Sequence, residues 1–234
     1  MIDIHRLVKG ALKRMKWLLH QLSRRRPSAR EIIPKYTDYV TVQIQDQCSW
    51  ESANPHYREG QRRYVQQAFV NIDRDLKILD MACGDGVGLQ QLKELGFQNV
   101  TGVDLNAEKS KCAKARSGYE VFCLDMHDLS SLRNGSFDIV YSSHTLEHAY
   151  DTHQALSEIC RVLKPAGFLL VVLPYPERDP TQDRGHCSKY ELGIDILDDG
   201  KTVTKYFTDR GFILVSKEWG IYRQPEIWLK LQKN

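Results

Sequence analysis

A glycine-rich turn directly follows a short apolar stretch in "ILDMACGDGVG", residues 78–88. Asp80 stands at the end of the apolar run, and glycine occupies positions 84, 86 and 88. A strand that turns on glycine into a helix brings bare backbone and a helix amino terminus to the carboxyl edge of a sheet, where ligands bind in open α/β folds. The spacing is not the dinucleotide fingerprint, because Leu89 stands where the third glycine would fall, and no P-loop lysine follows.

Two further acids stand at the ends of expected strands. "VTGVDLN" is apolar up to Asp104, and a carboxylate there can accept hydrogen bonds from both hydroxyls of a ribose. "VFCLDMHDL" ends at Asp125 beside Met126, a pair that can bind an exocyclic amine and cover the face of a ring. A glycine turn, a ribose-binding acid and a base-binding acid together indicate a nucleoside ligand that lacks a pyrophosphate.

These segments resemble the class I S-adenosylmethionine-dependent methyltransferases over roughly residues 70–234. "ILDMACGDG" is similar to their first motif. "SFDIVYSSHTLEHAYD" is similar to the fourth-strand motif of the small-molecule, type 11-like branch, and "ALSEICRVLKPAGFLLVVLP" to the helix and fifth strand after it. Ala82 departs from the glycine that many members have there. The resemblance implies S-adenosylmethionine as the cofactor and S-adenosylhomocysteine as its product.

The resemblance also implies which residues contact the cofactor. Asp104 would bind the ribose and Asp125 with Met126 the adenine, whereas Asp80 either contacts the ligand or only fixes the turn. Met126 can equally be a core residue. The full expected set is Asp80, Met81, Ala82, Cys83, Gly84, Gly86, Asp104, Leu105, Asp125, Met126, His127 and Ser143.

Methyl transfer depends mainly on holding a nucleophile in line behind the methyl group. Orientation can contribute about 7–11 kcal/mol, against roughly 3–5 kcal/mol for a general base. His144, His148 and His186 are the expected catalytic residues, because histidine can take a proton from a hydroxyl or ammonium nucleophile. The alternative for each is a hydrogen-bonded structural histidine. Tyr57, Arg58 and Tyr190 are expected to contact the acceptor, although the first two can equally be surface residues at a helix start.

The elements that must position these residues alternate along the chain. Apolar strands are expected near 77–81, 99–103, 120–124, 137–142 and 167–173, with helices near 87–95, 106–117 and 152–163. This alternation predicts a Rossmann-like α/β sandwich of three layers with a mostly parallel sheet. After residues 174–200, which lack periodicity, a helix near 202–209 and two final strands follow. The family resemblance implies seven strands in the order 3-2-1-4-5-7-6, with strand 7 antiparallel.

Charge divides the chain into a basic extension and an acidic body. The net charge of +3 hides nine Lys and Arg against one Asp within residues 1–30, which leaves −5 for the remainder. Apolar residues over 4–22 follow a helical stripe, opposite most of the basic residues. Such a helix can lie on an anionic membrane surface, or pack on the domain or on a second copy in a homodimer. The acidic body argues against a nucleic-acid partner.

The chain is therefore expected to have three parts: a basic helical extension (1–30), a cap segment (31–75) and a methyltransferase domain (76–234). The cap segment has an irregular pattern apart from a helix near 60–69. Six cysteines without a C-x-x-C pair predict no metal site, no disulfide framework and reduced thiols in a cytoplasmic protein. No apolar run is long enough to span a membrane, so any membrane contact would be peripheral, at the inner face.

The function expected from these patterns is methylation, on oxygen or nitrogen, of a small-molecule or lipid- or glycan-linked acceptor. One alternative is a protein or nucleic-acid methyltransferase. It is disfavoured because "SSHT" stands where the N/D-P-P-[YFW] motif of adenine- and amide-modifying members would fall. A second alternative is a cofactor-binding protein without turnover.

Overall fold

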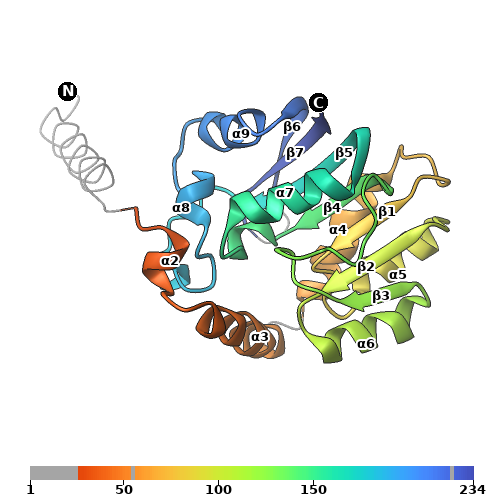
Figure 1. The fold of residues 1–234 in the computed structure, drawn as a ribbon, viewed down its shortest axis with the longest axis horizontal. Helices are drawn as coiled ribbons and strands as arrows, with labels where there is room; N and C mark the ends of the chain where they lie inside the picture. The colour runs from red at the N-terminus through yellow and green to blue at the C-terminus, as the bar shows by residue number, and fades with distance from the viewer. Residues whose placement is uncertain (1–25, 54–55, 222–223) are drawn as a thin grey trace, which may run out of the picture.

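The computed structural model describes residues 26–53, 56–221 and 224–234, and gives only the backbone for 46–53 and 57. The basic extension expected over 4–22 lies outside the described residues. Within them, the chain forms one sheet of seven strands (Figure 1). The strands are β1 (Ile78–Met81), β2 (Val100–Asp104), β3 (Glu120–Cys123), β4 (Phe137–Ser143), β5 (Leu163–Pro174), β6 (Phe212–Gly220) and β7 (Glu226–Lys233).

The sheet has the order β3-β2-β1-β4-β5-β7-β6, as the family resemblance implied. Strands β1 to β5 run parallel, and β7 is antiparallel to both of its neighbours. The parallel strands therefore present their carboxyl ends at one edge, where the residues after β1, β2 and β4 come together. The predicted fold class is confirmed.

Helices cover both faces of the sheet, as crossover connections between parallel strands require. One face is covered by α4 (Tyr57–Phe69), α5 (Val87–Glu94) and α6 (Ala107–Ser117), whose apolar residues share a core cluster with β1 and β4. On the other face lie α7 (Thr152–Val162) and α9 (Lys201–Thr208), with a second apolar cluster beneath them (Figure 1). The sheet is thus the middle of three layers.

Polar side chains fix where two of these helices begin. The side chain of Asn106 accepts hydrogen bonds from the backbone N–H groups of Glu108 and Lys109 at the start of α6. Asp151 accepts from the N–H of Gln154 at the start of α7. Caps of this kind satisfy backbone donors that have no partner within the helix, so both helices start close to the predicted residues.

The cap segment differs from its prediction. Residues 36–53 were expected to be irregular, but they form the helix α3 (Tyr36–Ala53), preceded by the short α2 (Ala29–Ile32). The prediction was wrong because the apolar residues of α3 are mixed with polar ones on every side, so no helical stripe can be recognised. Tertiary contacts hold the helix instead, since Tyr39 and Val42 are buried in a cluster that includes Cys187.

The segment 174–200 is packed against the domain and not a free loop. It contains the turn η2 (Pro180–Gln182) and the short helix α8 (Lys189–Leu192). The ammonium of Lys189 is fully buried and lies 2.6 Å from the carboxylate of Asp183. Breaking this buried ion pair would leave an uncompensated charge. The pair therefore holds the two parts of the segment that carry Lys189 and Asp183 together.

Two further findings concern the cysteines and the membrane. The thiols of Cys83, Cys112, Cys123, Cys160 and Cys187 are all free. Among the described residues, no helix combines the length and the apolar character needed to cross a bilayer.

Candidate active site

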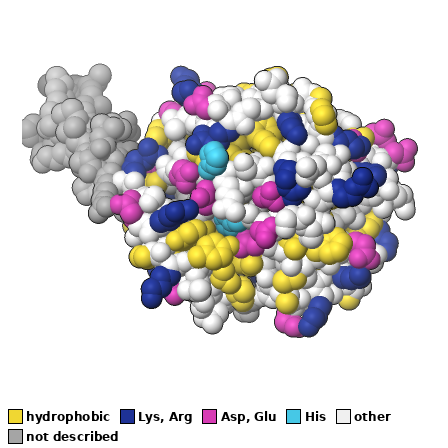
Figure 2. Space-filling model, in the orientation of Figure 1, with side chains coloured by type: hydrophobic (Ala, Val, Ile, Leu, Met, Phe, Trp, Pro, Cys, Tyr) yellow, Lys and Arg dark blue, Asp and Glu magenta, His cyan; other side chains and the backbone are white. Residues whose placement is uncertain are grey.

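A cavity of about 770 Å³ opens at the carboxyl edge of the sheet. Its floor includes Ala82, Gly84 and Asp104, one wall comes from α3, and the opposite wall comes from segment 174–186. Figure 2 shows histidine side chains reaching the surface of this face, beside acidic and basic ones. The volume is that of a pocket for a cofactor or a small ligand.

The glycine turn and the acid after β2 are joined in the cavity floor. The backbone N–H of Gly84 donates to Asp104 Oδ2 over 2.9 Å, and the N–H of Asn106 donates to Asp104 Oδ1 over 2.9 Å. Gly84 has a positive φ of 57°, and a Cβ added there would meet no atom within 4 Å. The turn therefore leaves open space beside a fixed carboxylate, which fits the ribose and the adjoining chain of S-adenosylmethionine.

Gly86 has a different role from the one its motif predicted. A Cβ at this position would lie 2.6 Å from the Cα of Ala113 in α6, and Gly86 does not line the cavity. Its positive φ of 84° begins α5. The residue is needed so that α5 and α6 can approach each other, and not for access of the cofactor to the backbone.

Alanine substitutions at the two glycines are expected to separate these roles. Gly86→Ala should destabilise the fold by about 2–4 kcal/mol, because overpacking adds to the strain of a left-handed residue. Gly84→Ala should cost only the strain, about 1–2 kcal/mol, but should weaken S-adenosylhomocysteine binding more than Gly86→Ala does. Urea unfolding and calorimetric titration measure the two quantities. Equal losses of affinity in the two variants would contradict the assignment.

Ala82 lines the cavity with a positive φ of 57°. Only glycine adopts this backbone conformation without strain, which explains why glycine suits the position. Met81 and Cys83, the neighbours of Ala82, are buried in the core on opposite faces of the sheet and do not line the cavity. Of the expected cofactor residues in this stretch, the cavity therefore reaches Ala82 and Gly84.

Asp80 lies beneath the turn, beside a separate space of about 20 Å³ that has room for about one water molecule. Burial, together with the charge of Asp104, raises the pKa of the Asp80 carboxyl to about 8. The carboxyl is then protonated at neutral pH in the folded protein. This position supports the structural alternative, in which Asp80 fixes the turn.

Asp80→Asn is expected to change how stability depends on pH. Between the unfolded pKa near 3.8 and the folded pKa near 8, the folded state binds the extra proton, so this group's contribution to stability is lost as the pH rises. The variant should therefore gain stability relative to the parent, by up to several kcal/mol near pH 9. Melting temperatures from pH 5 to 9 measure this. Asp138→Asn is the control, because Asp138 bonds to Lys164 and its pKa is lowered below 3.8, so its contribution is complete above about pH 5 and this variant should differ from the parent by a constant amount. For Asp80→Asn, a constant difference across the range would exclude the raised pKa.

The expected adenine residues are divided between the cavity and the region behind it. Leu105 and Met126 line the cavity, but Asp125 does not. The Asp125 carboxylate accepts hydrogen bonds from the hydroxyl of Tyr36 in α3 and from the backbone and ring of His127. His127 is buried, and its Nε2 accepts from the N–H groups of Tyr150 and Asp151. His127 thus orients Asp125 from behind.

His144 lies between two fully buried carboxylates. Its Nδ1 is 3.4 Å from Glu147 Oε1, and its Nε2 is 3.3 Å from Glu226 Oε1, which also accepts a hydrogen bond from Tyr64. Burial alone would lower the pKa of His144, but the two carboxylates raise it above its ordinary value. The two carboxylates therefore favour the charged form of the ring, and both of its nitrogens face acids.

His148 and His186 lie together in the cavity wall, with ring centroids 4.8 Å apart. His148 Nδ1 donates to the carbonyl of Gly185 over 2.9 Å, and His186 Nδ1 donates to Glu177 over 3.2 Å. Burial, and after it the proximity of His186, lowers the pKa of His148 to about 4, so its ring is neutral. Among the described residues, His148 and His186 each have one ring nitrogen without a hydrogen bond, whereas both nitrogens of His144 face acids.

Two of the expected acceptor residues, Arg58 and Tyr190, lie outside the cavity lining. Arg58 is half exposed and pairs with Asp85, while Tyr190 is buried and donates to Asp183. The side chain of Tyr57 lies outside the described residues. Ser143, expected at the cofactor, does line the cavity.

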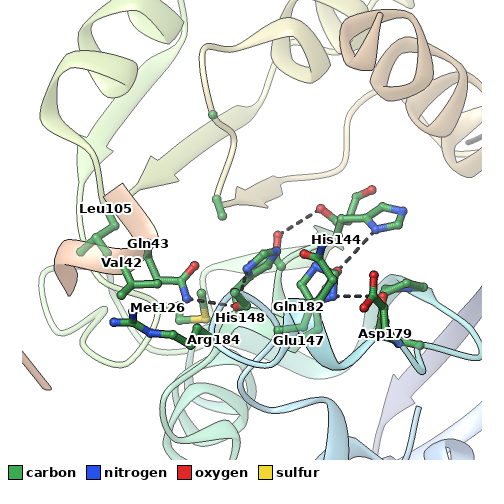
Figure 3. Close-up of a pocket in the computed structure, with 18 of the residues that line it drawn as sticks. Val42, Gln43, Leu105, Met126, His144, Glu147, His148, Asp179, Gln182 and Arg184 are labelled. Carbon is green, nitrogen blue, oxygen red and sulfur yellow. Dashed lines mark hydrogen bonds and ion pairs between the residues drawn. The ribbon is translucent and has the colours of Figure 1, made fainter. Parts of the chain in front are cut away.

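Several cavity residues had no signal in the sequence. They come from α3, from the segment after β5 and from the residue before β7, and they include Tyr39, Val42, Gln43, Glu177, Asp179, Gln182, Arg184 and Pro225. Figure 3 shows His148 between Leu105, Met126 and Gln43 on one side and His144, Glu147 and Asp179 on the other. After the predicted ligands, we name the part formed by the ends of β1 and β2 with Met126 the cofactor half, and the part formed by the histidines the acceptor half.

Comparison with known proteins agrees with this geometry. Residues 79–171 match a family described as a methyltransferase domain. The ubiquinone biosynthesis O-methyltransferase of Xanthomonas oryzae pv. oryzae is 30% identical over 130 residues, which are 52% of this chain and 54% of that protein. The 2-methyl-6-phytyl-1,4-hydroquinone methyltransferase of Synechocystis is 36% identical over 109 residues, 45% of this chain and 34% of that protein. The chain spans about half the length, or less, of these curated relatives.

Solved structures extend the likeness beyond the matched segment. The N-methyltransferase NodS of Bradyrhizobium japonicum, in complex with S-adenosylhomocysteine, aligns with a TM-score of 0.58 and 14% identity over 85% of this chain and 97% of that one. The [4+2]-cyclase SpnF aligns with a TM-score of 0.56 and 18% identity over 74% of this chain and 79% of that one. At these identities the alignments establish the fold alone. Together, the sheet order and the match over residues 79–171, less than half of the chain, show that this segment is similar to the methyltransferase domain family.

Proposed function

We propose that this protein transfers a methyl group from S-adenosylmethionine to a small-molecule or lipid-linked acceptor, on oxygen or nitrogen. The single observation that carries the proposal is the continuous cavity that joins the Gly84–Asp104 floor to the histidines beyond β4. When bound, S-adenosylmethionine supplies an electrophilic methyl group, so the chain itself mainly has to position the two reactants.

The residues of the cavity divide that task. Asp104 and the Gly84 turn would hold the cofactor, with Leu105 and Met126 beside its base. Asp125 does not line the cavity and is bonded to Tyr36 and His127, so its contact with the adenine amine stays a prediction. His148, with a free ring nitrogen, is the residue placed to accept a proton or a hydrogen bond from an acceptor. His144, with both nitrogens against acids, is better suited to position Glu147 than to take a proton.

Transfer of isotope-labelled methyl groups tests the proposal. The purified chain is incubated with labelled S-adenosylmethionine and a cell metabolite extract, and label is expected in small organic products. Label only in macromolecules would favour a protein or nucleic-acid substrate instead. Binding of S-adenosylhomocysteine without any methyl transfer would favour a function other than methyl transfer. The same fold also occurs in a protein named as a cyclase.

We propose further that residues 4–22 bring the acceptor half to an anionic membrane surface. The support is their basic, amphipathic pattern, together with relatives named for ubiquinone biosynthesis and a phytyl hydroquinone. Sedimentation with anionic vesicles is expected for the full chain and should weaken with salt. The matched variant reverses Lys9, Lys13 and Lys16 to Glu. If both forms remain unbound, or if both sediment equally with the vesicles, residues 4–22 are not a membrane anchor. Dimer formation that increases with protein concentration would instead favour packing of these residues on a second copy.

A further inference from the structure

We propose that Glu147, His148 and His186 bind one divalent transition-metal ion in the acceptor half of the cavity. Glu147 and His148 belong to the 3-10 turn η1 (Leu146–His148), and His186 follows η2 in the packed segment after β5. One potential ligand atom from each residue lies within 4.8 Å of the other two. All three residues line the same cavity.

The two histidines have the hydrogen bonds that metal ligands require. His148 Nδ1 donates to the carbonyl of Gly185, and His186 Nδ1 donates to the carboxylate of Glu177. A neutral ring carries one N–H, so these bonds leave the lone pair on Nε2 in both residues. Metal-bound histidines usually donate their other N–H to a carbonyl or a carboxylate in this way.

Glu147 supplies the second, independent observation. Its side chain is fully buried, and neither carboxylate oxygen receives a hydrogen bond among the described residues. His144 Nδ1 lies 3.4 Å from Oε1, close enough for an ion pair but without hydrogen-bond alignment. A buried carboxylate without hydrogen bonds is costly, and a cation would satisfy it. Figure 3 shows Glu147 and His148 close together in the cavity, with Gln182 beside them.

The chemistry of the three ligands indicates which ions fit. Two imidazoles and one carboxylate suit Fe²⁺, Co²⁺, Zn²⁺ or Mn²⁺ better than Mg²⁺ or Ca²⁺, which prefer oxygen. At bond lengths of about 2.1 Å, neighbouring ligand atoms lie about 3 Å apart, so the present separations of up to 4.8 Å must shrink by as much as about 2 Å when the ion binds. This cluster uses no cysteine, which is why the cysteine pattern did not predict it.

Three ligands leave coordination positions open toward the cavity, where an oxygen atom of the acceptor can bind. This role in holding the acceptor depends on the proposed methyl transfer, and with the ion bound it replaces direct contact of the acceptor with His148 Nε2, whose lone pair the ion uses. Binding of the ion itself does not depend on it.

Metal titration of the untagged full chain tests the site. After removal of metals with a chelator, Co²⁺ alone is added, and its visible absorption and the bound metal per chain are measured. One equivalent is expected. His148→Ala and His186→Ala should each weaken Co²⁺ binding by 100-fold or more, and Glu177→Gln by about 10-fold, because loss of an outer hydrogen bond usually costs 10–100-fold. His153→Ala, an exposed histidine on α7, is the matched control and should change nothing.

Two further measurements keep the outcomes distinct. X-ray absorption of the Zn²⁺-loaded parent should show two imidazole ligands. This measurement uses only the parent protein, so it does not depend on whether the variants fold. Calorimetric titration with S-adenosylhomocysteine reports the cofactor half separately. If the parent binds no Co²⁺, or if the two histidine variants fold and bind it as tightly as the parent, the metal site is refuted. If S-adenosylhomocysteine fails to bind while Co²⁺ binds, the methyl-transfer proposal fails and the metal site stands.

Discussion

His144→Ala is expected to destabilise the protein by about 3–5 kcal/mol. The ring lies between Glu147 and Glu226, which favour its charged form, and both of these carboxylates are fully buried. Removing one partner of a buried ion pair leaves an uncompensated charge, and here two carboxylates would lose the same partner. Urea unfolding measures the change. Turnover should fall further than affinity for S-adenosylhomocysteine does, because His144 belongs to the acceptor half.

A rescue variant makes this prediction specific. Adding Glu226→Gln to His144→Ala should recover part of the lost stability, since one buried carboxylate is removed while the amide oxygen can still accept from Tyr64. His153→Ala, at an exposed position, should change the free energy of unfolding by less than about 0.5 kcal/mol. An His144→Ala protein as stable as the parent would show that the ring does not carry the charge balance of this cluster.

Asp104→Ala is expected to weaken binding of S-adenosylhomocysteine by about 2–3 kcal/mol, or roughly 30- to 150-fold. The carboxylate accepts from the backbone N–H groups of Gly84 and Asn106, which fixes its direction. Its loss removes charge-assisted hydrogen bonds to the ribose and also releases the turn. Calorimetric titration measures the affinity.

The matched control for Asp104 is Glu120→Ala. Glu120 is an exposed acid at the opposite end of the neighbouring strand β3, where it pairs with Lys114. Its replacement should leave the affinity unchanged. Unaltered binding by Asp104→Ala would remove the ribose assignment, whatever the effect on stability.

The sheet and the cofactor half could be predicted because their signals are local. Apolar runs that end at Asp80 and Asp104 give both the strands and the residues at their carboxyl ends, and the capping side chains of Asn106 and Asp151 start the helices nearby. Parallel strands then bring those ends together without any further information. The order of the last two strands came from the family resemblance, since local patterns do not determine it.

The three histidines of the acceptor half were predicted, but their contacts could not be, because these contacts join distant segments. Glu226 stands 82 positions from His144 along the chain, and no spacing rule relates the two. Tyr36 reaches Asp125 from a helix that has no apolar stripe. His144 itself adopts a positive φ of 50°, a strained conformation for histidine that only the surrounding contacts can maintain. Gly86 was assigned to the ligand because its motif alone does not reveal Ala113 beneath it.

The position of β7 has a consequence for how the protein is made. Glu226 begins the strand that inserts between β5 and β6, so the buried charge cluster around His144 lacks one acid until that strand emerges from the ribosome. The floor for the adenosyl group, by contrast, is built from β1 to β4 and is synthesised earlier. The two parts of the cavity are therefore completed at different stages of synthesis, the Gly84–Asp104 floor before the charge cluster around His144.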